Sequence, residues 1–456
     1  MRLASRPIRA FIVTSLAAIA AGCGSGGAVS SAPQLPDFGA SRPLTSQKIK
    51  HIVIVVQENR SFNDLFYGYP GAKTSKYGYD SDGKRVNVYP IGLETSWDID
   101  HSSWSFFDAC NGTGSIPGTD CKMNGFNKES VGCGGRSDPC PTKYPQYAYV
   151  PHAETKPYFS IANQFVLADQ MYASNFDGSS FISHQYIISA QAESAVNYPF
   201  GSWGCPGGSG DQVEEVGQQR QIPAGYEIVC WDPTTLGDEL DTAGISWAYY
   251  ATAYGSNYPG IWSAYQAIKH IYYGNDWNKD VISPPSQFLK DVQAGKLRTV
   301  SWVTPTWANS DHAGSGSKTG PSWVASIVNT VGQSKYWNDT AMFIFWDDYG
   351  GWYDREPPAY VDYDGLGMRI PMLIVSPFAK QNYVSHVHYE HGSILKFVED
   401  EFGLGRLSAS DKRATSPAQD CFDFSGPPRK FKKIPSDLSV DYFLKQPLDN
   451  HIPDAQ

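Results

Sequence analysis

A run of five β-branched residues, Ile52 to Val56, is the feature of this sequence that most constrains its fold. An apolar run of this kind is typical of a strand buried on both faces, as in a parallel sheet covered by helices. The run ends abruptly in Gln57, Glu58 and Asn59. Because open α/β sheets bind ligands beyond the carboxyl ends of their strands, these polar residues stand where an active site would form. A solvated strand end would explain this one run equally well, so further motifs have to decide.

Further apolar stretches and helical patterns alternate along the chain. The other predicted strands are residues 244–252, 297–305, 341–348 and 370–377. A helix is predicted over residues 391–404, where the apolar side chains fall on one face and Gly403 is a stop signal. A second helix is predicted over residues 183–193, after a Gly-Ser-Ser turn. Strands alternating with helices predict an α/β fold, a three-layer sandwich around a mostly parallel central sheet.

The first 23 residues have the pattern of a secretory signal. Three arginines precede an apolar segment, residues 10–21, which is too short for a membrane span. The sequence AAGC, ending at Cys23, resembles the bacterial lipoprotein cleavage box, so we expect a lipid on Cys23 to anchor the mature protein to a membrane. The protein is therefore expected in the cell envelope, in a periplasmic or extracellular position. Residues 24–47, rich in Gly, Ser, Ala and Pro, are predicted to form a flexible linker.

The remaining sequence is predicted to form one catalytic domain, residues 48–430, followed by a C-terminal tail, residues 431–456. A domain of this size can bury a large core. Within it, residues 98–151 are rich in loop-forming residues and cysteines, which indicates an insertion over one rim. The formal net charge of −10 argues against non-specific binding to nucleic acid.

Eight cysteines in an exported chain favour disulfides. Without Cys23, the neighbouring pairs along the chain are 110 with 121, 133 with 140, and 205 with 230, which leaves Cys421 over. Spacing alone does not decide the pairing. No C-x-x-C pair is present, so we do not expect the cysteines to bind zinc.

A second apolar run, residues 341–346, ends in two adjacent carboxylates, Asp347 and Asp348. Two carboxylates at a buried strand end repel one another unless a cation lies between them. A bound divalent metal would remove this cost, and Gly350 and Gly351 would let the backbone turn closely around it. A surface Asp-Asp turn is the alternative, which the preceding apolar run disfavours.

Ser180 follows Gly178 at a predicted junction between a loop and a helix. The amide groups and the dipole at the start of a helix favour an anion. A serine at this position can act as a nucleophile towards phosphorus when a metal stabilises its alkoxide. On its own, Gly-Ser-Ser is more often a helix cap than a catalytic motif.

Three of the ten histidines stand at the edges of motifs: His101, His312 and His391. Each could donate a hydrogen bond to a phosphoryl oxygen or protonate a leaving group. Each is also compatible with a structural role.

Five motifs, taken together and in order, resemble the bacterial phosphoesterase family. They are HIVIVVQENRSFNDLF, GSSFISHQYIISAQ, FWDDYGGWYD, GLGMRIPMLIVSPFAK and HGSILKFVEDEFGL. The resemblance covers residues 48–424, and the family joins phosphatidylcholine-type phospholipases C with an acid phosphatase of an intracellular pathogen. It implies a fold similar to that of alkaline phosphatase.

The resemblance also implies roles for individual residues. It places one divalent metal ion, of unknown identity, on Glu58, Asn59, Ser180, Asp347 and Asp348. Ser180 would be the nucleophile as well as a metal ligand. His101, His312 and His391 would contact the phosphate and take part in catalysis, and Asn59 would also contact the substrate. The chain departs from the phospholipases C of the family in having Asp-Asp for Asp-Glu and Gly-Ser-Ser for Gly-Pro-Thr, which leaves the substrate more open than the chemistry.

The function so implied is that of a secreted, metal-dependent phosphoric-ester hydrolase of phospholipase C type that works through a phosphoserine intermediate. Its substrate would be a phosphate ester such as a phospholipid. The alternative is a phosphomonoesterase of acid phosphatase type. A more distant alternative is a cell-surface binding protein without activity.

Overall fold

The computed structural model describes residues 48–456 except 137, 253–259, 450 and 452–456. The expected signal peptide, the cysteine expected to carry a lipid and the expected linker lie outside the described residues.

A nine-stranded sheet forms the centre of the described chain, with the strand order β11-β10-β12-β1-β13-β14-β6-β15 and with β16 beside β6. Its strands are β1 (His51–Gln57), β6 (Val166–Tyr172), β10 (Trp247–Tyr250), β11 (Val281–Ile282), β12 (Val300–Val303), β13 (Thr340–Trp346), β14 (Arg369–Val375), β15 (Tyr383–Ser385) and β16 (Tyr389–Glu390). Among these strands, β14 pairs antiparallel with both of its neighbours and the other pairs are parallel. The predicted mostly parallel sheet is therefore confirmed.

The predicted strands differ from the observed ones mainly at their ends. β10 and β12 are shorter than predicted, at Trp247–Tyr250 and Val300–Val303, because the flanking residues belong to loops. The prediction missed β6, whose seven residues are all buried although two of them, Asp169 and Gln170, are polar. Asp169 is satisfied by the backbone N–H of Lys73 at 2.9 Å, so a polar residue can lie within this buried strand.

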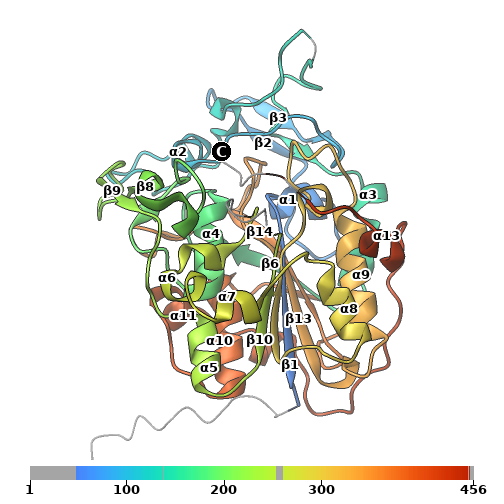
Figure 1. Cartoon of the computed structure of the whole chain (residues 1–456). Coiled ribbons are helices and arrows are strands. Elements are labelled where there is room, and N and C mark those ends of the chain that lie inside the picture. The colour runs from blue at the N-terminus through green and yellow to red at the C-terminus, as the bar shows by residue number, and fades with distance from the viewer. Residues whose placement is uncertain (1–47, 137, 253–259, 450, 452–456) are drawn as a thin grey trace, which may run out of the picture. The chain divides into compact units, whose positions relative to one another are not determined.

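Helices form a layer on each side of the sheet, as Figure 1 shows, and this confirms the three-layer sandwich. One layer contains α3 (His152–Ala162), α8 (Gln287–Gln293), α9 (Gly320–Gly332) and α13 (Val440–Leu444). The other contains α4 (Ser180–Ser189), α5 (Leu236–Thr242), α10 (His391–Phe402) and α11 (Ala409–Arg413). The remaining helices are α1 (Phe62–Phe66), α2 (Ser103–Cys110), α6 (Lys269–Tyr272), α7 (Asp276–Lys279) and α12 (Ala418–Cys421).

The two predicted helices begin or end at recognisable signals. α10 ends at Gly403, which adopts the left-handed conformation that glycine tolerates best. α4 begins three residues earlier than predicted, at Ser180. The early start brings Ser180 into the first turn of a helix, where the amide groups lack partners within the helix.

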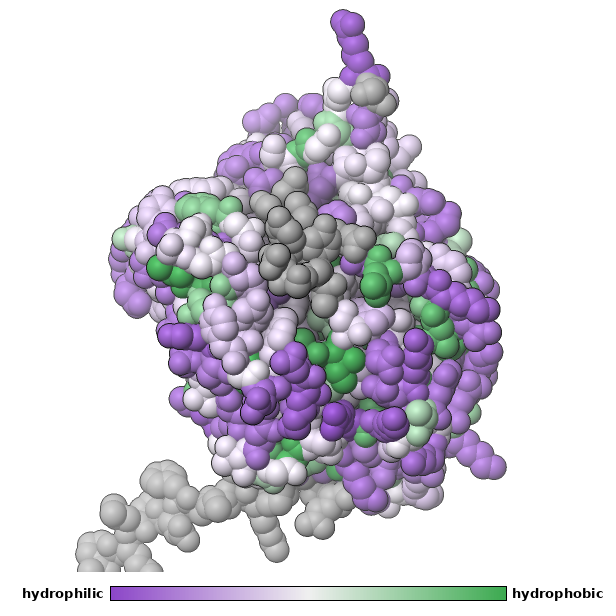
Figure 2. All heavy atoms as spheres, in the orientation of Figure 1, coloured by the Kyte–Doolittle hydropathy of each residue, from purple (hydrophilic) through white to green (hydrophobic). Residues whose placement is uncertain are grey.

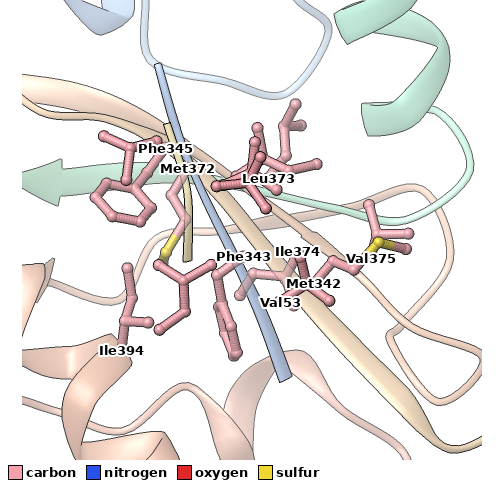
Figure 3. Packing of buried hydrophobic residues seen from close by; sticks show 14 of the residues in the cluster. Val53, Met342, Phe343, Phe345, Met372, Leu373, Ile374, Val375 and Ile394 are labelled. Carbon is pink, nitrogen blue, oxygen red and sulfur yellow. The ribbon is translucent and has the colours of Figure 1, made fainter. Parts of the chain in front are cut away.

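The core between the sheet and its helices is apolar. Figure 3 shows side chains of β1, β13 and β14 packing together, with Ile394 of α10 beside them. Val53, Phe343 and Ile374 are fully buried. Burying such side chains is the main favourable contribution to folding, at roughly 1.5–3 kcal/mol for each.

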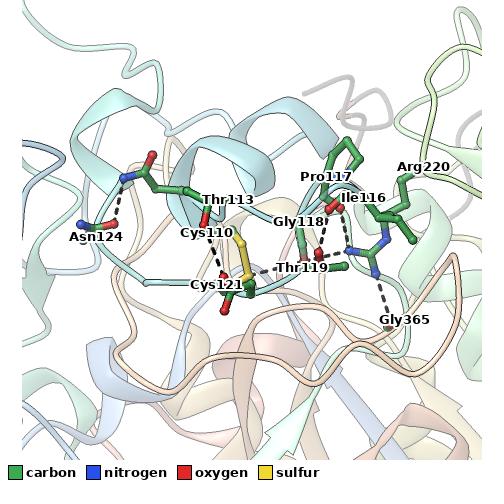
Figure 4. Close-up of a disulfide and its surroundings, with 12 residues drawn as sticks. Cys110, Thr113, Ile116, Pro117, Gly118, Thr119, Cys121, Asn124, Arg220 and Gly365 are labelled. Atoms are coloured by element: carbon green, nitrogen blue, oxygen red, sulfur yellow. Dashed lines mark hydrogen bonds between the residues drawn. A yellow bond between two sulfur atoms is a disulfide. The ribbon is translucent and has the colours of Figure 1, made fainter.

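Smaller sheets and disulfides cover the end of the main sheet at which β1 and β13 finish. These sheets pair β2 (Tyr77–Tyr79) with β3 (Arg85–Asn87), β4 (Tyr89–Pro90) with β5 (Ala148–Tyr149), and β8 (Gln212–Glu215) with β7 (Ala195–Val196) and β9 (Gly225–Ile228). The disulfides are Cys110–Cys121, Cys133–Cys140 and Cys205–Cys230, and Cys421 is free and buried. Beside the first of them, Arg220 donates hydrogen bonds to the carbonyls of Pro117, Gly118 and Gly365, as Figure 4 shows.

Most of the surface is polar, and Figure 2 shows apolar residues only in small, separate areas of the face it presents. None of the helices that the structure describes is long and apolar enough to span a membrane. In the last described segment, Ile434 and Phe443 are buried, and the side chain of Asn329 in α9 hydrogen-bonds the backbone of Ile434 through both its N–H and its carbonyl.

Candidate active site

The carboxyl ends of β1 and β13 meet at one point because the two strands are adjacent and parallel. Their register pairs Gln57 with Trp346, so the residues that follow each strand are neighbours. Glu58, Asn59, Asp347 and Asp348 are all fully buried there. The backbone N–H of Asn59 donates to Asp347 Oδ1 at 3.0 Å, which joins the two strand ends.

The backbone around these residues is tightly folded. Asn59 has a φ of 58°, a left-handed conformation that asparagine tolerates better than most residues. Gly350 has a φ of 59°, and a Cβ atom on it would lie 2.2 Å from the carbonyl oxygen of Asn59. Only glycine fits at this position, so the Gly-Gly turn predicted from the sequence is required by a close approach of two backbones.

Ser180 lies beside the carboxylates at the start of α4. Its hydroxyl lies 3.2 Å from Asp348 Oδ2 and 3.3 Å from the carboxamide of Asn59. The neighbouring Ser179 faces elsewhere, since its hydroxyl donates to the carbonyl of Asn197 at 2.7 Å. Of the two serines, Ser180 is the one that faces the carboxylates.

The carboxamide of Asn59 lies between the carboxylates and two histidines. One of its two terminal atoms is 3.2 Å from Asp347 Oδ1, 3.2 Å from Glu58 Oε2 and 3.3 Å from Ser180 Oγ. The other is 2.8 Å from His101 Nε2 and 3.0 Å from His312 Nε2. If the oxygen of the carboxamide faces the carboxylates, the site can bind a cation. If the nitrogen faces them, it can donate hydrogen bonds to them instead.

The contacts of Nδ1 in the two histidines identify which carboxamide atom is the oxygen. His101 Nδ1 lies 2.6 Å from the carbonyl of Ile99, and His312 Nδ1 lies 2.5 Å from the carbonyl of Ala313. A carbonyl only accepts, so each Nδ1 carries a proton, and in the neutral ring Nε2 is then an acceptor. The Asn59 amide nitrogen must therefore face the two histidines, and its oxygen faces the carboxylates.

The resulting group of oxygens fits a divalent metal ion. The carboxamide oxygen of Asn59 faces Glu58, Asp347 and Ser180 oxygens at 3.2–3.3 Å, and Asp348 adjoins Ser180. Atoms that bind one hard divalent ion at about 2.1–2.4 Å lie roughly 3.0–3.4 Å apart when they are at right angles. Without a cation, buried oxygens facing one another at these distances would repel. The residues present therefore match the ligand set expected from the sequence.

The structure brings His101 and His312 to Asn59 and leaves His391 apart from it. His391 is the first residue of α10, and its Nδ1 accepts a hydrogen bond from the backbone N–H of Ser174 at 3.4 Å. Its Nε2 is buried without a hydrogen-bond partner in the described part of the chain. Burial lowers the pKa of His391 to about 4, although the nearby Asp347 carboxylate acts to raise it.

Sequence analysis missed His184, which lies one helical turn after Ser180 on α4. Its Nε2 is 3.0 Å from Glu58 Oε1 and 3.8 Å from Asp347 Oδ2. Burial lowers its pKa to about 4, opposed by the Asp347 carboxylate, so the ring is neutral at pH 7. The spacing of four residues from Ser180 to His184 is a signal only once the helix is known to begin at Ser180, because residues four apart then share a face.

Tyr198 is a second contact that the sequence did not reveal. Its hydroxyl accepts a hydrogen bond from the backbone N–H of Ser180 at 3.3 Å and lies 3.0 Å from His101 Nε2. Tyr198 also lines a cavity of about 700 Å³ together with Trp104 and Phe200. Tyr198 therefore contacts Ser180 and His101 and also lines this cavity.

Comparisons with known proteins agree with the motifs. Residues 49–405 match the model described as Phosphoesterase family. Non-specific phospholipase C1 of Arabidopsis thaliana is 24% identical over 428 residues, which cover 82% of this chain and 73% of that protein. Phospholipase C A of Mycobacterium tuberculosis is 23% identical over 443 residues, covering 83% of this chain and 78% of that protein.

The non-hemolytic phospholipase C of Pseudomonas aeruginosa is 24% identical over 462 residues, covering 86% of this chain. The match covers only 60% of that relative's own length. Among solved structures, a protein in the alkaline phosphatase superfamily from Vibrio parahaemolyticus is 11% identical, with a TM-score of 0.37, over 82% of this chain and 72% of that one. A TM-score this low is too weak for us to draw anything from it.

Proposed function

The chain belongs to the Phosphoesterase family, and we propose that it is a metal-dependent hydrolase of phosphate esters with a phospholipase C-type reaction. The observation that carries this proposal is the hydroxyl of Ser180, which lies 3.2 Å from Asp348 and beside the carboxamide oxygen of Asn59. A nucleophile, a group that can accept its proton and the ligands for a cation are thus within contact of one another.

In the proposed reaction, Ser180 Oγ attacks phosphorus and its proton passes to Asp348 Oδ2, to which the hydroxyl already donates. The bond from phosphorus to the leaving alcohol breaks, and the phosphoryl group stays on Ser180. Water then cleaves the phosphoserine bond and restores the hydroxyl. A divalent ion held by Glu58, Asn59, Asp347 and Asp348 would supply positive charge to the alkoxide and to the phosphoryl oxygens.

The histidines have different parts in this proposal. His101 and His312 hold the amide nitrogen of Asn59, which fixes the direction of the carboxamide oxygen. Both ring nitrogens of His101 and of His312 have partners in this arrangement, so contact of these two residues with the phosphate stays a prediction. Contact of His391 with the phosphate is also a prediction, since its Nδ1 accepts from the backbone N–H of Ser174.

A phospholipid is the substrate that the relatives favour, since the similar proteins of Arabidopsis, Mycobacterium and Pseudomonas carry the name phospholipase C. The cavity of about 700 Å³ beside Tyr198 supports a phosphate that carries a further substituent. Export and anchoring through a lipid on Cys23 belong to the same proposal. A phosphomonoester substrate is the alternative that the experiment below separates.

The test uses the full chain and two kinds of substrate, phosphatidylcholine vesicles and an aryl phosphate. Release of phosphocholine from the vesicles in excess of phosphate from the aryl phosphate would support the phospholipase C-type reaction. Ser180→Ala should lower turnover at least about 1,000-fold, as expected for a lost nucleophile. The matched control is Ser179→Ala, whose hydroxyl is bonded to Asn197 and which should keep turnover within a few-fold. Wild-type activity in Ser180→Ala would exclude the proposed nucleophile.

A further inference from the structure

The carboxylates of Glu58 and Asp347 each direct their two oxygens to different neighbours. Glu58 Oε2 and Asp347 Oδ1 are both 3.2 Å from the carboxamide oxygen of Asn59. The other two oxygens face His184, with Glu58 Oε1 at 3.0 Å and Asp347 Oδ2 at 3.8 Å from Nε2. Two groups of potential ligands therefore share the same two carboxylates.

The second group meets the conditions for a binding site in its own right. Glu58, His184 and Asp347 are buried, and each offers one ligand atom such that the three atoms lie within 4.8 Å of one another. Asp347 Oδ2 has no hydrogen-bond partner among the residues that the structure describes. Leaving a buried carboxylate oxygen in this state is costly, so it points to a ligand that is bound there.

The surroundings of His184 indicate which of its nitrogens carries the proton. Its Nδ1 lies 3.4 Å from the hydroxyl oxygen of Tyr249, and that hydroxyl donates its own proton to the carbonyl of Trp262 at 2.9 Å. The tyrosine oxygen is therefore left as an acceptor for a proton on His184 Nδ1. With the proton on Nδ1, the lone pair of Nε2 faces the two carboxylates, which is favourable only when a cation lies between them; without a cation, Nε2 would carry the proton and donate it to Glu58 Oε1 at 3.0 Å. Three electron-rich atoms directed at one point are the arrangement of a metal site.

We propose that Glu58, His184 and Asp347 bind a second metal ion, with both carboxylates bridging it to the ion of the proposed function. The ligand set contains an imidazole nitrogen, which suits Zn²⁺ or Fe²⁺ better than Mg²⁺ or Ca²⁺, and two carboxylates, which also suit Mn²⁺. Ions that share bridging carboxylates are about 3.5–4 Å apart in two-metal sites. This inference rests on the proposed function, which includes the first ion. The second ion would occupy a separate position.

The stoichiometry of bound metal tests the proposal directly. The full chain is stripped of metal, dialysed against Mn²⁺ or Zn²⁺, and analysed by elemental mass spectrometry. The expected result is two ions per chain. With Mn²⁺, electron paramagnetic resonance should in addition show the signal of a magnetically coupled pair. A single ion per wild-type chain, with an uncoupled spectrum, would overturn the second site.

His184→Gln sharpens the test because glutamine keeps a hydrogen-bond donor near Glu58 but is a poor ligand for these metals. The variant should bind one ion and lose the coupled signal. The matched control is His386→Gln, since the side chain of His386 is 52% exposed and bonds Asp169 instead. This control should still bind two ions. If His184→Gln folds and also binds two ions, His184 is a hydrogen-bond donor to Glu58 and the proposal is wrong.

Failure of this inference and failure of the proposed function give different results. If the wild-type chain binds one ion and hydrolyses phosphate esters, and if Ser180→Ala abolishes this activity, only the second site is wrong. If the wild-type chain binds no metal, the proposed metal-dependent reaction is wrong as well. Should His184→Gln fail to fold, the wild-type stoichiometry and spectrum still decide the question.

Discussion

Two groups of side chains in the described residues have the spacing to hold a metal ion, and they differ in almost every other respect. The first is Glu58, His184 and Asp347, all buried, and the second, the surface group, is the exposed Asp241, the half-buried Asp276 and the buried Asp280. In the second group, Lys279 Nζ lies 2.9 Å from Asp280 and 4.0 Å from each of the other two carboxylates. The protein itself thus supplies a cation to the surface group.

The comparison shows that ligand spacing alone does not make a metal site. Carboxylates in water, or beside a lysine, gain little from an additional cation. Buried carboxylates beside a neutral histidine keep their charge only when a cation compensates the loss of water. Burial and the absence of a hydrogen-bond partner on Asp347 Oδ2 therefore carry more weight than the number of acidic residues.

The largest difference between the two groups should appear when one carboxylate is removed from each. Asp347→Asn should lose bound metal and lower turnover at least about 1,000-fold, because it removes a ligand of both proposed ions. Asp280→Asn, the matched change in the surface group, should leave both unchanged. Metal content and phosphate-ester hydrolysis are the measurements, and equal losses in the two variants would contradict the distinction.

Metal removal should affect stability as well as activity. Adding Mn²⁺ or Zn²⁺ to the metal-free chain at about 100 times the dissociation constant should raise the free energy of unfolding by about 2.7 kcal/mol for each ion bound. Thermal or urea unfolding with and without metal measures this gain. Asp276→Asn should show the same gain, whereas a reduced gain in this variant would mean that the surface group binds metal too.

Asp364 shows what a buried carboxylate does without a metal, and it predicts a pH dependence. Burial raises its pKa to about 8, and the hydroxyl of Tyr186 donates a hydrogen bond to it. Since the folded chain keeps this proton while the unfolded chain loses it near pH 4, stability is full below pH 4 and falls as the pH rises towards 8.

Between pH 6 and pH 7 this proton alone should lower the free energy of unfolding by about 1.4 kcal/mol. Asp364→Asn lacks the proton, so its stability should be less dependent on pH by that amount. Urea unfolding of both chains at the two pH values is the measurement. Identical slopes would show that Asp364 is ionised in the folded protein.

The smallest effect is expected from the cation of the surface group. Lys279→Ala should lower the free energy of unfolding by about 1 kcal/mol, because the lysine side chain is 59% exposed and its entropy offsets the ion pairs. Its metal content should stay that of the wild type, because Arg298 still lies 3.8 Å from the buried Asp280 carboxylate. New binding of one Mn²⁺ per chain would show that Lys279 had occupied a real metal position.

The strand ends were predictable because each is marked by an abrupt change in local chemistry. The β-branched run before Glu58 and the apolar run before Asp347 both predicted buried strands that end in polar residues, and β1 and β13 have this form. The sequence could not indicate that the two strands are adjacent, since residues 58 and 347 are brought together only by the order of strands in the sheet. Family resemblance, rather than periodicity, brought these residues into one expected site.

The rest of the site depends on details that a sequence pattern does not contain. His184 requires the register of α4 relative to β1, and the direction of the Asn59 carboxamide requires the partners of two histidine rings. His391 was predicted from its place at the start of a helix. Its contact with Ser174 arises between segments more than 200 residues apart, and no local signal predicts it.

β1 pairs with β13 from His51–Thr340 to Gln57–Trp346. The backbone hydrogen bonds of this pairing fix the positions of the site residues that follow the two strands. Sliding one strand by a single residue would move its ligands about 3.3 Å and turn them to the opposite face. Loss of activity on heating should therefore coincide with cooperative melting of the whole sheet. The amide hydrogens of this ladder should be among the slowest in the molecule to exchange with deuterium.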